Sequence, residues 1–190
     1  MNSIPGVDAQ LMEAYVRGKP AYDQLFPAFY DRVADQVLQA LQSEYPEIEA
    51  VVGPRDRANA EARFPEQRDH IPLDWVAFGF AGMDMYDFHV GTVLDFSEWP
   101  VTYRQGLHIA DELYELARGG VDAIDWKTVV GVEPAALHQV AIREYQWLDP
   151  RHEFDFADIE SQAARMAQRI IAYYKAAVAI AYQVRTELAQ

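Results

Sequence analysis

The C-terminal segment 163–188 carries the pattern that most restricts how this chain can fold. Its apolar residues follow one another at steps of three or four, so they form one continuous stripe along a helix. The stripe consists of Ala163, Met166, Ile170, Tyr173, Ala177, Ile180, Val184 and Leu188. Between Ile170 and Tyr182 only Lys175 is charged, yet this stretch is shorter than the roughly 20 residues that a bilayer crossing requires. We therefore predict a long helix buried at the centre of the fold.

Residues 74–96 carry the clearest strand pattern. Segments 74–81 and 87–96 are rich in β-branched and aromatic residues, and the turn between them contains Gly82, which is typical of an antiparallel hairpin. Alternation puts the bulky side chains on one face and Gly79 and Gly91 on the other. Because glycine lets a helix backbone approach closely, we predict that the C-terminal helix packs on the glycine-bearing face.

Weaker patterns fill in the rest of the fold. Gly18 and Pro20 predict the end of a first helix, and Asp155 is the predicted N-cap of the C-terminal helix. The other expected elements are helices at 8–17, 22–45 and 107–118 and a strand at 137–148. Together these elements predict one α+β domain, residues 1–190, in which an antiparallel β-sheet with hairpin 74–96 packs against helices.

The chain has 190 residues and contains no cysteine. This length lets one domain bury a core without disulfides or a structural metal. The lack of cysteine excludes disulfide scaffolds, thiol catalysis and zinc sites built on thiolates. The first residues, MNSIPGVDAQ, lack the basic and apolar regions of a secretory signal, so we expect a soluble protein with a cytoplasmic location.

The charge balance restricts the possible partners. Acidic side chains outnumber basic ones by 30 to 16, which gives a formal net charge of -14. A surface of this sign repels a phosphate backbone, so general nucleic-acid binding is disfavoured. The acidity could mimic nucleic acid or complement a basic partner, and the alternative is that it serves solubility alone.

The turn GMDMYD, residues 82–87, holds the side chains most capable of chemistry. Asp84, Asp87 and His89 could supply an acid and a base, or ligands for a divalent ion. Alternation along the strand brings Asp87 and His89 to the same side, and Glu144 is the candidate third catalytic group. The alternative is that the aspartates form the turn by accepting backbone N–H bonds, while His89 packs on the sheet with one nitrogen hydrogen-bonded.

The same turn offers few ligands for a metal ion. Calcium usually takes six to eight oxygens and zinc takes three or four protein ligands, whereas the turn supplies two carboxylates and one imidazole. We therefore predict that the turn is a hairpin bend, and we predict no metal and no cofactor.

Aromatic residues are more numerous than a minimal core needs, so some are candidates for lining a ligand pocket or an interface. These candidates are Trp99, Tyr103, Trp126 and Trp147. The alternative is an aromatic-rich core. The chain contains no G-x-S-x-G, P-loop or G-x-G-x-x-G motif, so serine catalysis and nucleotide hydrolysis through those motifs lack support.

The strand sequences DWVAF and FHVGTV resemble the hairpin of the uncharacterised bacterial YktB-like family. The resemblance covers the hairpin region 74–96 and implies a compact α+β fold with an antiparallel sheet. Members of that family carry basic residues around the turn, whereas the turn here is acidic. The resemblance implies no activity.

Two hypotheses about function follow. The first is a non-enzymatic binding or protein-interaction module, whose acidic surface with embedded aromatic residues meets a basic or apolar protein partner or a small-molecule ligand. The alternative is a small hydrolase or metal-assisted enzyme that uses Asp87 and His89 together with Glu144. Neither hypothesis involves a membrane, and the oligomeric state stays open.

Overall fold

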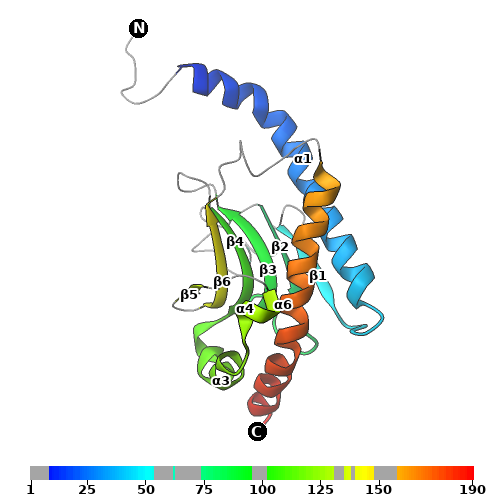
Figure 1. Ribbon diagram of the computed structural model, residues 1–190, viewed down its shortest axis with the longest axis vertical. Coiled ribbons are helices and arrows are strands. Elements are labelled where there is room, and N and C mark those ends of the chain that lie inside the picture. The colour runs from blue at the N-terminus through cyan, green and yellow to red at the C-terminus, as the bar shows by residue number, and fades with distance from the viewer. Residues whose placement is uncertain are drawn as a thin grey trace.

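The computed structural model describes residues 9–53, 62, 74–95, 102–130, 135–137, 140–147 and 158–190. The helices in this part of the chain are α1 (Ala9–Leu41), α3 (Asp111–Asp122), α4 (Trp126–Val130) and α6 (Ile159–Leu188). The strands are β1 (Glu49–Val52), β2 (Asp74–Gly79), β3 (Phe88–Asp95), β4 (Thr102–Ile109), β5 (Ala135–Leu137) and β6 (Val140–Trp147). Figure 1 shows α6 running across the sheet, beside α1.

The strands form one six-stranded sheet in the order β1-β2-β3-β4-β6-β5, and every neighbouring pair is antiparallel. The predicted hairpin is confirmed, since β2 and β3 pair from Asp74↔Leu94 to Gly79↔His89. The predicted α+β fold with an antiparallel sheet and a long C-terminal helix is confirmed as well.

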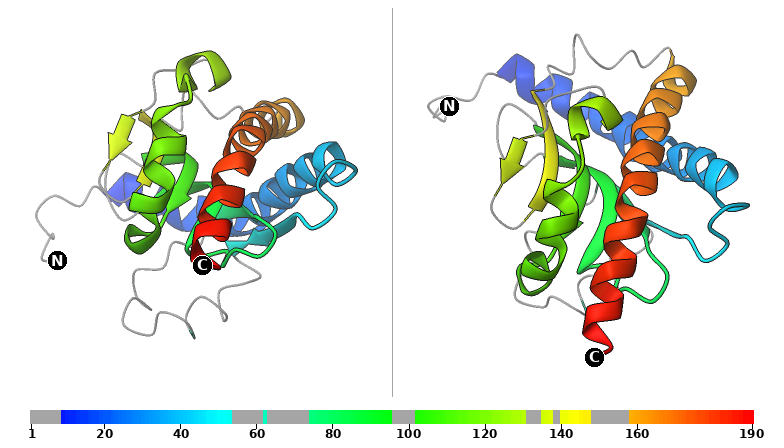
Figure 2. Two further views of the ribbon diagram at one scale, coloured as in Figure 1. Left: turned by 90° about the horizontal axis from the view of Figure 1, so that it is seen from below. Right: turned by 60° about the horizontal axis from the view of Figure 1, so that its bottom comes forward.

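One hydrophobic core joins the sheet to the helices. The strand residues in this core are Val52, Val76, Phe78, Phe88, Val90, Leu107 and Ile109, which alternate along their strands, and Phe80 directly after β2 joins them. Register pairs such as Phe78↔Val90 and Val90↔Leu107 put these side chains on the same face. Figure 2 shows α3 and α6 over one side of the sheet, so the described elements form two layers around a single core.

The apolar stripe of α6 is buried as predicted over most of its length. Ile170, Tyr173 and Ala177 have no exposed surface, whereas Leu188, in the last turn, is 57% exposed. No described helix combines the length and the apolar character that a bilayer crossing requires.

The predicted contact between α6 and the glycine-bearing face of the hairpin is wrong. Gln105 pairs with Thr92 on the bulky face, and its Nε2 donates to Met166 O of α6 at 3.3 Å. A Cβ built on Gly91 would lie 2.5 Å from Val76 O, and one on Gly79 would lie 2.8 Å from Met85 Cε. The glycines therefore make room for neighbours within the hairpin, and the bulky face supplies the apolar area that the helix buries.

Helix α1 continues through the predicted stop. It spans 33 residues and includes Gly18, Pro20 and Pro27, so the expected break between segments 8–17 and 22–45 is absent. Proline removes a backbone donor, but its fixed φ is itself helical. From Phe29 to Leu41 the helix contributes to the core, which holds this part in place.

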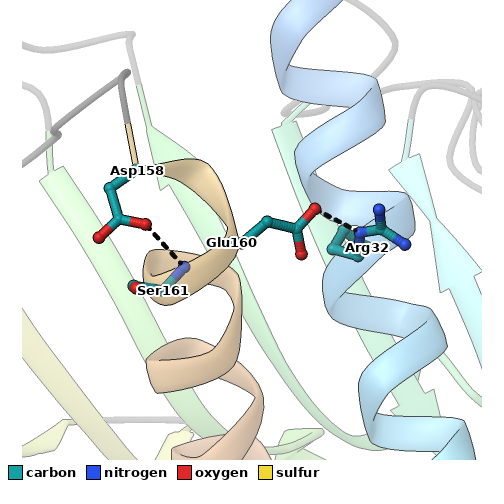
Figure 3. Close-up of polar contacts among 4 residues, drawn as sticks. All are labelled: Arg32, Asp158, Glu160 and Ser161. Atoms are coloured by element: carbon teal, nitrogen blue, oxygen red, sulfur yellow. Dashed lines mark hydrogen bonds and ion pairs between the residues drawn. The ribbon is translucent and has the colours of Figure 1, made fainter.

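The first turn of α6 is fixed by two polar contacts (Figure 3). Asp158 is the N-cap, and its Oδ1 accepts a bond from Ser161 N at 3.3 Å. Glu160 meets Arg32 of α1, with Arg32 Nε 2.9 Å from Glu160 Oε1. The prediction of Asp155 as the N-cap is wrong, because the helix begins at Ile159 and the cap must directly precede it.

Candidate functional site

A cleft lies where three segments of the chain meet: residues 44–49 after α1, the β2–β3 turn, and the C-terminal half of α6. We call it the docking cleft, and it consists of two adjoining cavities. The first, the aromatic chamber, has a volume of about 230 Å³, and its aromatic and aliphatic lining includes Tyr45, Ile48, Phe80, Tyr174, Val178 and Tyr182. The second, the acidic chamber, has a volume of about 500 Å³, and its lining includes Glu47, Glu49, Gly79, Met83 and Met85.

Short backbone contacts position the two loop walls of the docking cleft. After α1, Tyr45 N donates to Leu41 O at 2.8 Å, and Ile48 N donates to Tyr45 O at 3.1 Å. In the other wall Met83 N donates to Phe80 O at 3.0 Å, and Gly82 has a φ of 71°. A positive φ of this size is easily reached only by glycine, so the turn beside the cleft depends on that residue.

The rings of the aromatic chamber pack on one another. Phe80 stacks on Tyr174 with centroids 4.4 Å apart, and Tyr45 meets Tyr174 edge-on at 5.5 Å. Tyr174 Oη donates to Gly79 O at 3.0 Å, which ties α6 to the end of β2. These contacts pack the rings into a continuous apolar wall of the chamber.

Ionisable groups around the aromatic chamber have shifted pKa values. Burial raises the pKa of Tyr174 to about 12, with a smaller contribution from the charge of Tyr45. Burial also raises the pKa of Tyr45, and the hydrogen bond to Glu44 adds to this effect. The hydrogen bond from Lys175 lowers the pKa of Glu44, and the same bond raises the pKa of Lys175. At neutral pH the two phenols are therefore neutral, while Glu44 and Lys175 form an ion pair at 2.8 Å.

The charges at the rim of the docking cleft are mainly negative. Glu47 and Glu49 are exposed carboxylates in its lining. Arg185 is the base among the described lining residues, and its Nη1 donates to Ala81 O at 3.0 Å while its guanidinium lies 5.4 Å from the centre of the Tyr182 ring. The cleft thus combines an apolar wall with an acidic rim.

The turn GMDMYD is a hairpin bend, as predicted. Asp84 Oδ1 accepts a bond from Tyr86 N at 2.9 Å, the turn-forming role expected of aspartate. His89 Nδ1 lies 2.8 Å from Met85 O, and because a carbonyl oxygen only accepts, Nδ1 carries the proton. The His89 ring also stacks on His108, with centroids 4.7 Å apart.

The sheet register separates Glu144 from His89, another of the three candidate catalytic residues. Asp87 precedes β3, and its main-chain oxygen accepts a bond from Ala110 N at 2.7 Å. Glu144 of β6 pairs with Gln105, which pairs with Thr92. Thr92 and His89 are three positions apart on β3 and so lie on opposite faces. The register therefore does not bring position 144 to the side of His89.

The described residues offer no cluster of side chains suited to a metal ion. In those ranges no three His, Asp or Glu side chains lie close enough together to hold an ion. The hypothesis of a metal-assisted enzyme gains no support from the side chains that the structure places.

Among the four candidate ligand-binding aromatics, Trp126 is the one whose side chain the structure describes, and it does not line the docking cleft. Trp126 is 7% exposed, donates from Nε1 to Val121 O at 3.0 Å, and stacks on Tyr173, so it belongs to the core. Tyr103 lies on β4 and Trp147 on β6, where the backbone is described but the side chains are not, and Trp99 lies outside the described residues.

Sequence reasoning missed the rings that do line the aromatic chamber. Two signals were present. Tyr45 stands in an acidic loop segment, EYPEIE, where an aromatic ring is unusual. Tyr174 lies beside the stripe of α6, which indicates that the helix buries a second face.

No protein-family model matches the chain, and no curated protein and no solved structure shows a significant similarity to it. The resemblance of the hairpin to the YktB-like family therefore stays a prediction.

Proposed function

We propose that the protein is a non-enzymatic binding module that receives a basic or apolar segment of a partner protein in the docking cleft. The observation that carries this proposal is the stack of Phe80 and Tyr174 beside the exposed carboxylates of Glu47 and Glu49. An apolar wall with an acidic rim suits a ligand that is apolar in one part and cationic in another.

The two parts of the docking cleft make different contributions to binding. Burying one large apolar side chain contributes roughly 1.5–3 kcal/mol, so the aromatic chamber supplies affinity. The carboxylates, together with the formal net charge of -14, attract a basic partner and speed its association. Recognition of this kind weakens as salt screens the rim charges.

The groups around the aromatic chamber favour recognition over proton transfer. A general acid or base works best with a pKa near the working pH, whereas burial moves the pKa of Tyr174 to about 12. The hydrogen bond from Lys175 moves the pKa of Glu44 further below neutrality. The enzymatic alternative with Asp87, His89 and Glu144 stays a prediction that the register does not favour.

The proposal includes a location in the cytoplasm, where the partner would be found. Cell fractionation of the native host tests this part directly: we expect the protein in the soluble cytoplasmic fraction, and recovery from another compartment would contradict it.

An array of random-sequence peptides tests the binding function. We expect the wild-type protein to bind peptides that contain both apolar and basic residues, with signals that fall as salt rises. Val178 lines the aromatic chamber, so Val178→Lys should weaken these signals by about tenfold or more. Val129→Lys is the matched control, because Val129 is an exposed valine of α4 outside the cleft lining. No bound peptide, or equal effects of the two variants, would overturn the proposal.

A further inference from the structure

We infer that the docking cleft recognises an extended peptide segment in which an apolar or aromatic side chain and a lysine or arginine side chain are close neighbours. This inference rests on the proposed binding function and assigns one chamber of the cleft to each side chain.

The aromatic chamber fits a single side chain. Its volume of about 230 Å³ is below the roughly 300–1,000 Å³ of typical small-molecule pockets. The walls are the stacked rings of Phe80 and Tyr174, with Ile48 and Val178 completing the apolar surface. An apolar or aromatic side chain inserted here would exchange water for ring and methyl contacts on several sides.

The acidic chamber fits a cationic side chain. Its lining contains the carboxylates of Glu47 and Glu49, and no base occurs among its described lining residues. Met83 and Met85 form part of the same wall, and flexible thioethers can pack along the aliphatic stem of a lysine or arginine. The charged end of that side chain would then reach the carboxylates.

The protein's own cations near the aromatic chamber already have partners. Lys175 Nζ is bound to Glu44 Oε2 at 2.8 Å, and Arg185 donates to Ala81 O. The acidic character of the second chamber is therefore set by Glu49, which lines that chamber alone, and by Glu47 on the shared wall.

The two chambers are close enough for neighbouring residues of one peptide. The chambers share a wall, because five residues belong to the lining of both: Pro46, Glu47, Ile48, Phe80 and Ala81. Side chains at positions i and i+2 of an extended segment point to the same side and lie roughly 6.5–7 Å apart. An apolar residue and a basic residue at this spacing can enter the two chambers together.

Four labelled peptides of one length test this assignment by fluorescence anisotropy. They carry leucine or alanine at one position and lysine or glutamine two positions away. We expect the leucine–lysine peptide to bind the wild-type protein about tenfold more tightly than either single replacement, and the alanine–glutamine peptide to bind weakest.

Variants of the protein separate the chambers. The double variant Glu47→Gln/Glu49→Gln should lose the preference for lysine over glutamine and keep the preference for leucine over alanine. Val178→Gln, which alters the aromatic chamber without adding a charge, should lose the preference for leucine over alanine and keep the preference for lysine over glutamine. The control is Glu112→Gln/Glu115→Gln, which removes the same charge from exposed positions of α3. Thermal melts of all variants establish that each is folded.

Each outcome decides between the two proposals. If none of the peptides binds the wild-type protein and the array also shows no binding, the proposed function fails. If peptides bind, but the cleft and control double variants lose lysine preference equally, the net charge and not the acidic chamber selects the cation. In that case the assignment of chambers is overturned while the binding function stands. Binding of the alanine–glutamine peptide as tightly as the leucine–lysine peptide would overturn the assignment as well.

Discussion

Tyr174 links several features of the molecule through one side chain. Its ring forms the wall of the aromatic chamber, and its hydroxyl donates to Gly79 O. Burial of the phenol raises its pKa to about 12, from the usual value of 10. Ionisation would place a negative charge in an apolar site and would remove the donated bond.

This pKa shift predicts a loss of stability at high pH. Because the folded-state pKa is raised, the contribution of Tyr174 is fully present below pH 10 and is lost as the pH rises toward about 12. Tyr174→Phe should cost about 1 kcal/mol at neutral pH through the lost hydrogen bond and should flatten the alkaline decline. Urea titrations across this pH range measure both effects. Tyr182→Phe, at a 64% exposed position, is the control, and equal alkaline slopes for wild type and Tyr174→Phe would contradict the assignment.

Gly91 predicts a second effect at the level of a single residue. A Cβ at this position would lie 2.5 Å from Val76 O and 3.0 Å from Ala77 Cα, so Gly91→Ala should destabilise the protein by about 1–3 kcal/mol. Gly119 lies in α3 with nothing within 4 Å of an added Cβ. Gly119→Ala should therefore stabilise by up to about 1 kcal/mol. Denaturant midpoints of the two variants should move in opposite directions, and a shared direction would refute this explanation.

The role of a site residue could be predicted where it depends on a contact with near neighbours in the sequence, and not where it depends on distant segments. The role of Asp84 follows from the hydrogen bond that an aspartate offers to the residue two positions ahead. The rings of Tyr45, Phe80 and Tyr174 come from three separate segments, and the signals at Tyr45 and Tyr174 do not indicate that these rings meet. Only the tertiary fold brings them together, so no pattern along the chain could show the aromatic chamber.

Among the secondary-structure elements, α6 holds the core together. Ile170 has no exposed surface, so Ile170→Asp would leave a charge in the core and should abolish the cooperative thermal transition. Ile170→Ala is expected to remain folded at a cost of about 2–5 kcal/mol. Gln168→Asp, at an exposed position of the same helix, is the control for adding a charge. A cooperative melt of Ile170→Asp near the wild-type temperature would show that the stripe is not essential.

The two contacts at the start of α6 should differ in strength. Asp158→Ala removes the N-cap and should cost about 1 kcal/mol, because an orphan N–H of the first turn loses its acceptor. Glu160→Gln removes the ion pair with Arg32, whose side chains are 66% and 51% exposed, and should cost less, since exposed pairs are screened by water. Urea midpoints for both variants decide the order, and a larger loss for Glu160→Gln would contradict it.

The sequence correctly predicted a helix or a strand where a long periodic pattern of apolar residues belongs to a buried face. The α6 stripe and the β2–β3 alternation both satisfy this condition. The boundary between β4 and the next helix was predicted wrongly. A helix was expected to begin at Leu107, whereas β4 continues to Ile109. Leu107 and Ile109 pair with Val90 and Phe88 in the sheet, and that non-local pairing outweighs local helical spacing.

At the scale of the whole molecule, the choice of covered face depended on tertiary packing. A helix could have packed on either face of the hairpin. The glycine-bearing face would allow a close approach of the helix backbone, and the bulky face offers more apolar area. In the structure α6 covers the face with the larger apolar area. Val76 and Phe78 of that face are fully buried in the core that α6 shares. A sequence pattern identifies the two faces but not the free energy that selects between them.

The docking cleft exists only while residues 44–49, the turn after β2 and the C-terminal half of α6 are held together. The unfolded chain has no such surface, so an occupant binds the native state alone, and its binding energy adds to the free energy of unfolding. At a concentration of about 100 times Kd, an occupant should contribute about 2.7 kcal/mol and raise the Tm by about 5–10 °C. A thermal-shift screen can therefore find ligands without any knowledge of their identity, and Val178→Lys should abolish the shift for those that use the aromatic chamber.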